Sequence, residues 1–441
     1  MVSFSGKNLV VKSNITIIGA GILGTALGYF LSNVTDKKVL VLEQAPEVAF
    51  HTSSRNTGKV HAPFLYDPQK KRLFAKAAAL GFEMWETYAK QKNLPFKKDG
   101  VLEVSLDEQG TKRLEKYLSW GEQNGLKKDE IKFLDSSEVS RQEPEVRCQK
   151  AILCTKDASV DYGKFAKSLM EDAKQGGTSF LLNTRAEKIQ DKKEFLEIKT
   201  NSGIIQTDHI INAAGGMSID IAHAMGTAQD LTDIHFRGEY WQADKIYSNL
   251  TRVSVYSVPK HSEYPFLDPH WIVRHDGRCE VGPNAVPVFS PYGYNFTENI
   301  KEFPSKIVEM LSSGAAKMLF DSQFLSLATS EFLSSVSKNV MINRVREFLP
   351  KVDPSKFHIR GTAGVRASVI DSSGKFVPDA VIKEGTKSTH ILNYNSPGAT
   401  GALPFAVYVI EQMCQKGIIK IQNTGCGPWN YSKILEFLNA N

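Results

Sequence analysis

Residues 15–24 have the sequence Ile15-Thr16-Ile17-Ile18-Gly19-Ala20-Gly21-Ile22-Leu23-Gly24. An apolar run of strand type leads here into a G-x-G-x-x-G turn and then into a helical pattern. In such a turn Gly19 permits the tight bend, Gly21 lets the backbone approach a pyrophosphate, and Gly24 lets helix and strand pack closely. The N-terminus of the helix adds free N–H donors and the positive end of a dipole. The stretch therefore predicts a dinucleotide site.

The next apolar run, residues 39–42, supports this interpretation because an acid follows it. Glu43 comes after Gly24 at close to the ~20 residues expected for a carboxylate that binds the adenosine ribose. An ordinary glycine-rich turn would explain the glycines alone. The order of strand, turn, helix, strand and acid favours the dinucleotide fold.

Length and composition indicate a soluble globular protein of two domains, since the chain has 441 residues, 41% of them hydrophobic and 23% charged. The formal charge of +6 comes from dispersed basic residues, so we expect solvated surface charge and no nucleic-acid partner. No run approaches the ~18 to 20 apolar residues of a membrane span, and residues 1–11 do not resemble a signal peptide. We expect a cytoplasmic protein, with peripheral contact to the inner face of a membrane left open.

The five cysteines are odd in number and include no C-x-x-C pair. This pattern predicts neither a disulfide framework nor a zinc site. We expect reduced, mostly buried thiols and no metal centre. The cysteines are Cys148, Cys154, Cys279, Cys414 and Cys426.

Residues 50–61 form a polar stretch that is rich in hydroxyl groups. Short hydroxyl side chains and a glycine can approach the phosphate and ribityl oxygens of a long cofactor. A solvated turn is the alternative. The residues that we expect to contact the cofactor here are Ser53, Ser54, Asn56, Thr57 and Gly58.

The rest of the chain alternates between two kinds of pattern. Helical spacing marks residues 69–92, 107–124, 164–175, 299–337 and 403–415, and strand-like runs lie between them. We expect an α/β protein with a Rossmann-like FAD-binding domain built from residues 14–98, 150–230 and 340–441. Residues 99–149 and 231–339 would form an α+β substrate domain, a β-sheet with covering helices.

Further small-residue segments far along the chain favour FAD over NAD, because an extended cofactor would be contacted at each return to the first domain. A buried strand ends near Ala214 and Gly215, and Gly364 lies in a glycine-rich strand end. Gly398, Ala399 and Thr400 precede the last long helix. With Ala186, on another strand, these complete the expected cofactor contacts.

The sequence resembles the flavin-dependent D-amino acid oxidase superfamily, and within it the L-2-hydroxyglutarate dehydrogenase/oxidase family. The resemblance covers nearly the whole chain, and its most specific carriers are the Gly-Pro-Asn-Ala-Val run at 282–286 and the Ala-Gly-Val-Arg run at 363–366. Other carriers are residues 56–61, 160–162, 236–240, 264–267, 276–277, 360–367 and 396–400.

This resemblance implies oxidation of an L-2-hydroxy dicarboxylate to the 2-oxo acid, with hydride passing to FAD and electrons passing to a quinone, another acceptor or O2. His61 matches the family's histidine and is suited to be the base that removes the hydroxyl proton. Arg366 would bind a substrate carboxylate through its fork of donors. His270, Arg237 and Tyr240 are further candidates for substrate binding.

Some residues depart from the family pattern. Residues 62–66 and the Asp268-Pro269 pair replace smaller segments, and Lys59 would add positive charge near the ring. L-Malate therefore stays open beside L-2-hydroxyglutarate, since one methylene is worth only ~1 to 3 kcal/mol in discrimination. An amino acid or glycerol 3-phosphate enzyme and a non-catalytic flavoprotein subunit are the alternatives. Quinone use would predict an exposed apolar patch, for example at residues 307–320.

Overall fold

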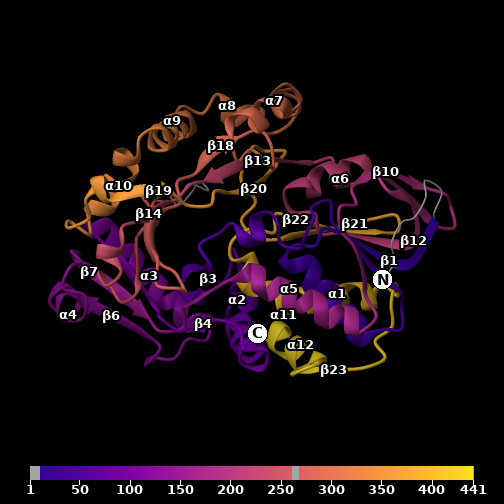
Figure 1. Cartoon of the computed structure of the whole chain (residues 1–441), viewed down its shortest axis with the longest axis horizontal. Coiled ribbons are helices and arrows are strands. Elements are labelled where there is room, and N and C mark those ends of the chain that lie inside the picture. The colour runs from indigo at the N-terminus through magenta and orange to yellow at the C-terminus, as the bar shows by residue number, and fades with distance from the viewer. Residues whose placement is uncertain (1–9, 261–267, 441) are drawn as a thin grey trace.

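The computed structural model describes residues 10–260 and 268–440, and two large β-sheets lie side by side in it (Figure 1). The family-like residues 264–267 fall outside these ranges. In the described chain the first sheet has eight strands in the order β10-β11-β12-β1-β2-β9, with β22 paired to β12 and β21 to β22. Its strands are β1 (Val10–Ile18), β2 (Val39–Leu42), β9 (Ser179–Leu181), β10 (Ala186–Asp191), β11 (Leu196–Thr200), β12 (Gly203–Asn212), β21 (Val381–Gly385) and β22 (Ser388–Leu392).

The centre of the first sheet is parallel and covered on both faces. Strand β1 pairs in parallel with β2 and β12, so that Ile17 lies beside Val41 and Ile211. Ile17 and Val41 face a core shared with the helices, whereas Ile18 and Leu40 face a second core on the other side. This explains the continuous apolar runs, because a strand buried on both faces loses the alternation of a half-exposed strand.

Four long helices complete the larger core of this sheet. They are α1 (Ile22–Val34), α2 (Arg72–Lys92), α5 (Tyr162–Gln175) and α11 (Gly398–Gln415), and the short C-terminal α12 (Tyr431–Asn439) packs on α2 and α11. The small hairpin of β23 (Gly425–Cys426) and β24 (Trp429–Asn430) lies against α1. Helix α6 (Ser218–Ala224) contacts β12 and β22.

The second sheet collects strands from distant parts of the chain. Its order is β19-β14-β17-β16-β15-β5-β7-β6, and only the β15–β5 pair among these described strands is parallel. The strands are β5 (Val101–Ser105), β6 (Ile131–Asp135), β7 (Lys150–Cys154), β14 (Trp241–Ala243), β15 (Ser254–Ser257), β16 (His270–Val273), β17 (Cys279–Gly282) and β19 (Phe357–Arg360). Helix α10 (Lys338–Arg346) packs on one face and α3 (Glu108–Gln123) on the other, while α4 (Ser136–Gln142) contacts β6 and β7.

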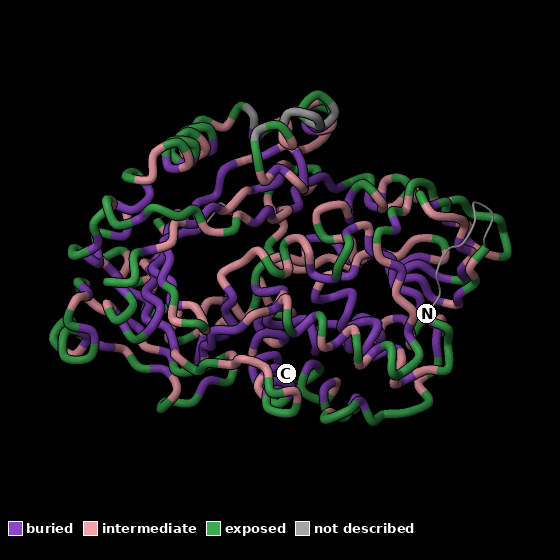
Figure 2. The backbone as a smooth tube through the Cα atoms, viewed as in Figure 1, coloured by how far each residue is buried: buried purple, intermediate pink, exposed green. Residues whose placement is uncertain are grey.

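Two three-stranded sheets stand beside the large ones. One contains β13 (Leu231–Gly238), β18 (Val286–Val288) and β20 (Gly364–Asp371), and the other contains β3 (Lys59–Val60), β4 (Phe96–Lys97) and β8 (Ala158–Val160). Helices α7 (Phe296–Leu311), α8 (Ala316–Leu319) and α9 (Ser322–Val336) lie at one edge of the molecule. Figure 2 shows long buried stretches in both large sheets and a largely exposed surface on α9.

The structure confirms the α/β class, the expected helices and the five free thiols. One boundary is wrong: the last long helix begins at Gly398, five residues before the expected start at Leu403. Its glycines favoured a loop, but Gly401 sits where the helix presses against Ala77 of α2. No helix of the described residues is both long and apolar enough to cross a bilayer.

The division into two discontinuous domains stays a proposal. Strand β7, which our division at residue 150 gave to the first domain, hydrogen-bonds to β5 and β6 in the second sheet. Strand β19 and helix α10, also given to the first domain, pack in the second sheet and on its face.

Replacing Gly81 with Ala should destabilise the α2–α11 contact. A Cβ at Gly81 would lie 2.1 Å from the Thr400 carbonyl oxygen, which accepts a hydrogen bond from Trp85 Nε1 at 2.9 Å. The ~1 kcal/mol gain in helix propensity is smaller than this clash. We expect the free energy of unfolding to fall by about 1 to 3 kcal/mol in chemical denaturation. Gln91→Ala, exposed on the same helix, should change it by less than ~0.5 kcal/mol; equal effects would contradict this packing.

Candidate active site

The glycine turn has the close contacts that its sequence predicts. Strand β1 ends at Ile18 and α1 begins at Ile22. Gly19 has φ +104°, and a Cβ on Gly24 would lie 1.9 Å from the Gly19 carbonyl oxygen. Gly21 lies against Ser53, whose Oγ accepts a hydrogen bond from the Ile22 N–H at 2.9 Å. The turn therefore brings Ser53 of the hydroxyl-rich stretch to the N-terminus of α1.

Glu43 stands at the end of β2 beside this turn. Its side chain is buried and accepts hydrogen bonds from the Ala20 N–H at 2.9 Å and from the Ala45 N–H at 2.8 Å. Burial raises the pKa of the Glu43 carboxyl, and these N–H groups oppose that rise. A carboxylate has further lone pairs, so Glu43 can also accept from a ribose hydroxyl.

A cavity of about 890 Å³ extends from the glycine turn to the second sheet. This volume lies at the upper end of the ~300 to 1,000 Å³ range of ligand pockets, as a long cofactor with a substrate beside it requires. Three expected cofactor residues do not line the cavity: Gly24, Ser54 and Gly58. A Cβ on Gly58 would lie 2.7 Å from the Val160 carbonyl oxygen, so this glycine is needed for packing. The expected cofactor residues that line the cavity are Gly19, Gly21, Glu43, Ser53, Asn56, Thr57, Ala186, Ala214, Gly215, Gly364, Gly398, Ala399 and Thr400.

These lining residues fit FAD. The turn and the start of α1 provide backbone donors at one end, and the first turn of α11 provides small residues at the other. Gly21 and Gly364 leave no room for a larger side chain in this lining, since a Cβ would lie 2.9 Å from Ser53 Oγ and 1.8 Å from the Arg55 carbonyl oxygen, respectively.

His61 enters the cavity directly after β3. Its N–H donates to Thr400 Oγ1 at 3.0 Å, which fixes its backbone against the first turn of α11. The imidazole Nδ1 lies 3.7 Å from Asp157 Oδ2, a separation longer than a hydrogen bond. The His61 side chain is 15% exposed, so one edge of the ring reaches the cavity while the other faces a buried carboxylate.

A buried group of charges lies behind His61. Lys59 Nζ is 3.2 Å from Asp99 Oδ1 and 3.7 Å from Asp157 Oδ1, and all three side chains are at most 1% exposed. Ser159 Oγ donates to Asp99 Oδ2 at 2.6 Å. Lys59 lines the cavity as expected, but its positive charge is paired with two carboxylates, so the expected surplus of positive charge is wrong.

Arg366 provides a cation at the cavity wall. It lies on β20 opposite Phe236 of β13, and its guanidinium carbon is 5.9 Å from the Phe236 ring centre. Within the described chain, Nη2 has no hydrogen-bond partner. Burial lowers the pKa of Arg366 to about 10, so the group stays charged at neutral pH. It is ready to bind an anion.

His270 and Tyr240 also line the cavity, whereas Arg237 does not. Burial lowers the pKa of His270 to about 3, so this ring is neutral at physiological pH and cannot serve as a cation for a carboxylate. Arg237 Nε is paired with Glu239 Oε1 at 3.1 Å, and Nη1 donates to the Gly293 carbonyl at 3.2 Å. The positive charge of Arg237 is thus paired with Glu239, away from the cavity.

Sequence reasoning missed Tyr256 and Glu103, which are buried and line the same cavity. The Tyr256 ring stacks on His270 with ring centres 4.1 Å apart. Tyr256 lies in one of the expected strand-like runs. Its hydroxyl group was the sequence feature that could have marked it as a site residue. No local pattern marked Glu103, whose place depends on the pairing of distant strands.

Comparison with known proteins shows which family the chain belongs to. A family model described as FAD dependent oxidoreductase (DAO) matches residues 14–412. The chain is 31% identical over 401 residues to an L-2-hydroxyglutarate dehydrogenase of Indibacter alkaliphilus, covering 90% of this chain and 98% of that protein. It is 30% identical over 412 residues to a mitochondrial L-2-hydroxyglutarate dehydrogenase of Caenorhabditis elegans, covering 91% and 93%.

Solved structures share the fold. The dithionite-reduced L-alpha-glycerophosphate oxidase of Mycoplasma pneumoniae with FAD bound has a TM-score of 0.70 at 20% identity, covering 98% of this chain and 95% of that one. The L-proline dehydrogenase of P. horikoshii has a TM-score of 0.66 at 17% identity, covering 94% and 96%. The family model over residues 14–412, with the relatives at 30% and 31% identity, shows that the chain belongs to the DAO family of FAD dependent oxidoreductases.

Proposed function

We propose that this flavoenzyme oxidises L-2-hydroxyglutarate to the 2-oxo acid at the end of the cavity between His61 and Arg366. The observation that carries the proposal is that these two residues, far apart in sequence, line one cavity with the glycine turn. A base and a fixed cation are what a 2-hydroxy acid needs for oxidation. The names of the similar dehydrogenases support the choice of substrate.

Bound FAD supplies a two-electron acceptor for the hydride that leaves C2. The protein handles the proton: His61 takes it from the C2 hydroxyl as the C=O bond forms. Asp157 faces Nδ1, so we assign the N–H to Nδ1 and the basic lone pair to Nε2. The buried Asp157 carboxylate then stabilises the imidazolium that forms.

Arg366 binds the C1 carboxylate of the substrate. A guanidinium presents paired N–H donors that match both carboxylate oxygens, and its partly buried position strengthens the pairing. Tyr240 lies close enough to Arg366 that the guanidinium charge opposes the rise in the Tyr240 pKa caused by burial. Both residues line the same cavity. Holding C1 in this way fixes C2 and its hydroxyl relative to His61.

A substrate panel tests the reaction. The purified flavoprotein is mixed without oxygen with L- and D-2-hydroxyglutarate, L-malate, glycerol 3-phosphate and amino acids, and flavin absorbance is followed. We expect the fastest bleaching with L-2-hydroxyglutarate, because the pocket binds an L-2-hydroxy acid through C1. Faster bleaching by L-malate would mean that the preferred substrate is shorter than L-2-hydroxyglutarate by one methylene. Bleaching only by glycerol 3-phosphate or an amino acid, or by none of the compounds, would refute the proposal.

The role of His61 is tested by His61→Ala. This variant should keep bound flavin but be reduced by L-2-hydroxyglutarate at least ~100-fold more slowly, since loss of a general base costs about that factor. Stopped-flow absorbance gives the rate. His358→Ala, which removes an exposed histidine on β19, is the matched control and should react like the parent. An unchanged rate in His61→Ala would remove His61 from the reaction.

We further propose that a membrane quinone takes the electrons. Exposed apolar side chains lie on α7 and just beyond α8: Val308 is 66% exposed, Leu311 54% and Phe320 80%. Val308 and Leu311 are three residues apart, so they share one face of α7. Such a face suits docking on a lipid surface.

The Val308→Ser/Leu311→Ser double variant tests this acceptor. It should lose sedimentation with phospholipid vesicles and slow the reduction of quinone held in them, while substrate still bleaches its flavin as in the parent. Ile246→Ser, which replaces another 66% exposed apolar side chain, is the control. Vesicle binding equal to that of the parent would argue against docking by α7.

A further inference from the structure

A row of buried polar side chains crosses the second sheet beneath the cavity. On the parallel strands β5 and β15, Glu103 lies beside Tyr256, so both point to the same face. On β16, His270 continues the row and stacks on Tyr256. All three line the cavity, and each has a buried polar atom with no hydrogen-bond partner in the described part of the chain: Glu103 Oε2, Tyr256 Oη and His270 Nδ1.

Glu103 is the acid of this row and is only 2% exposed. The titratable groups that act on it are Asp268 before β16, Tyr117 on α3 and Tyr256 on β15, while its neighbour across β7 is the apolar Ile152. No salt bridge joins Glu103 to a cation among the residues the structure describes. Burial, with a smaller contribution from the charge of Asp268, raises the pKa of Glu103 to about 8. At neutral pH the group is therefore a neutral acid with an O–H to donate.

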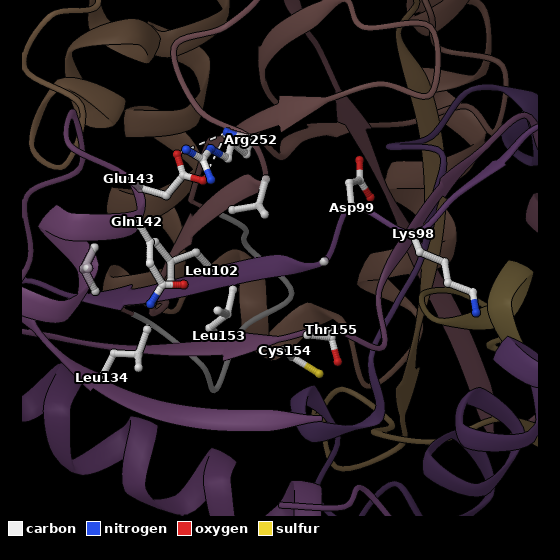
Figure 3. Close-up of a pocket in the computed structure, with 13 residues that line it drawn as sticks. Lys98, Asp99, Leu102, Leu134, Gln142, Glu143, Leu153, Cys154, Thr155 and Arg252 are labelled. Carbon is white, nitrogen blue, oxygen red and sulfur yellow. Dashed lines mark hydrogen bonds between the residues drawn. The ribbon is translucent and has the colours of Figure 1, made fainter. Parts of the chain in front are cut away.

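Two other buried glutamates, Glu143 and Glu43, have their oxygens paired. Glu143 lines a separate cavity of about 320 Å³ in the second sheet, where both its oxygens accept from the Arg252 N–H at 3.1 Å (Figure 3). Glu43 likewise accepts from two backbone N–H groups. An unsatisfied buried polar atom costs ~1 to 3 kcal/mol, so its persistence on a cavity wall points to a ligand that pairs with it.

We propose that Glu103 is a specificity-determining residue that donates a hydrogen bond from its protonated carboxyl to the second carboxylate of a dicarboxylic substrate. The assignment rests on the proposed function in placing the first carboxylate at Arg366. Arg366 belongs to the β13–β20 sheet, whereas Glu103 lies on β5, so the two groups hold different ends of the ligand. An O–H donor to an ionised oxygen is among the stronger hydrogen bonds in proteins.

The sign of the pH dependence follows from the groups around Glu103. Below about pH 8 Glu103 is protonated and binds the anion, and above it the carboxylate repels the anion. Although burial opposes it, the paired Arg344 guanidinium lowers the pKa of Asp268, so that Asp268 stays ionised. Burial raises the pKa of Tyr117 and of Tyr256 and lowers that of His270 to about 3, so these three stay neutral. Dicarboxylate affinity should therefore fall as pH rises from 7 to 9, a range in which Arg366, whose pKa is about 10, is still mostly charged.

Calorimetric titration of the oxidised holoenzyme with glutarate and with pentanoate tests this assignment. The two ligands share a five-carbon chain and differ in the second carboxylate, and neither carries the hydroxyl that is oxidised. Glu103→Leu should weaken glutarate binding about tenfold or more at pH 7 and leave pentanoate binding within about twofold. Glu103→Gln, which keeps an N–H donor, should recover most of that loss and bind glutarate without the decline between pH 7 and 9. Glu143→Gln, which removes a buried carboxyl away from this cavity, should retain that decline.

Several outcomes would overturn the assignment. An equal loss of both ligands in Glu103→Leu would mean a structural role, which bound-flavin absorbance and thermal unfolding would also reveal. A decline between pH 7 and 9 that persists in Glu103→Gln would place the titration elsewhere, because Arg366 loses its charge only at higher pH. Tighter binding above pH 8 of a ligand with an ammonium in place of the second carboxylate would make Glu103 a cation site. Because glutarate is not oxidised, these results stand apart from the substrate panel, in which failure of every 2-hydroxy acid refutes the proposed function instead.

Discussion

The buried pairing of Lys59 with Asp99 and Asp157 connects the parts of the molecule on which the site depends. Lys59 lies near the end of the hydroxyl-rich stretch, Asp99 leads into β5 of the second sheet, and Asp157 precedes β8. Asp157 also accepts from the Ala62 N–H at 3.2 Å and lies beside His61. Removing one member of a buried pair leaves an uncompensated charge and typically costs about 3 to 5 kcal/mol. The charges therefore fix His61 between the cofactor cavity and the second sheet.

The rest of the site is built around the position of His61. The first sheet and α1 provide the glycine turn and Glu43, and α11 provides Thr400, whose hydroxyl holds the His61 backbone. The facing wall comes from the second sheet and from β20. It combines one charged group, Arg366, with neutral donors and acceptors on Glu103, Tyr256 and His270. In a water-poor cavity such groups discriminate strongly between ligands. A ligand that leaves one of these polar groups without a hydrogen-bond partner binds more weakly.

Local patterns predicted the strand, glycine turn and helix that the structure contains, while the cofactor contacts assigned to them stay predictions. The turn, the strand at residues 39–42 and Glu43 lie within thirty residues, and their geometry follows from adjacent sequence. Helix α11 began earlier than expected because glycine suggested a loop, whereas Gly401 and Gly81 allow two helices to approach closely. Tertiary pairing decided the rest. Sequence alone could not show that Lys59 pairs with two carboxylates or that Glu239 forms an ion pair with Arg237. Nor could it show that β5 and β15 pair, which brings Glu103 to the cavity.

In the proposed reaction, the C2–H bond of an L-2-hydroxy acid breaks in this cavity while His61 takes the hydroxyl proton. Single-turnover flavin reduction, measured without oxygen at saturating L-2-hydroxyglutarate with either hydrogen or deuterium at C2, tests it most directly. Reduction should be severalfold slower with deuterium, because breaking the C2–H bond limits this step. Equal rates with the two isotopes would contradict it.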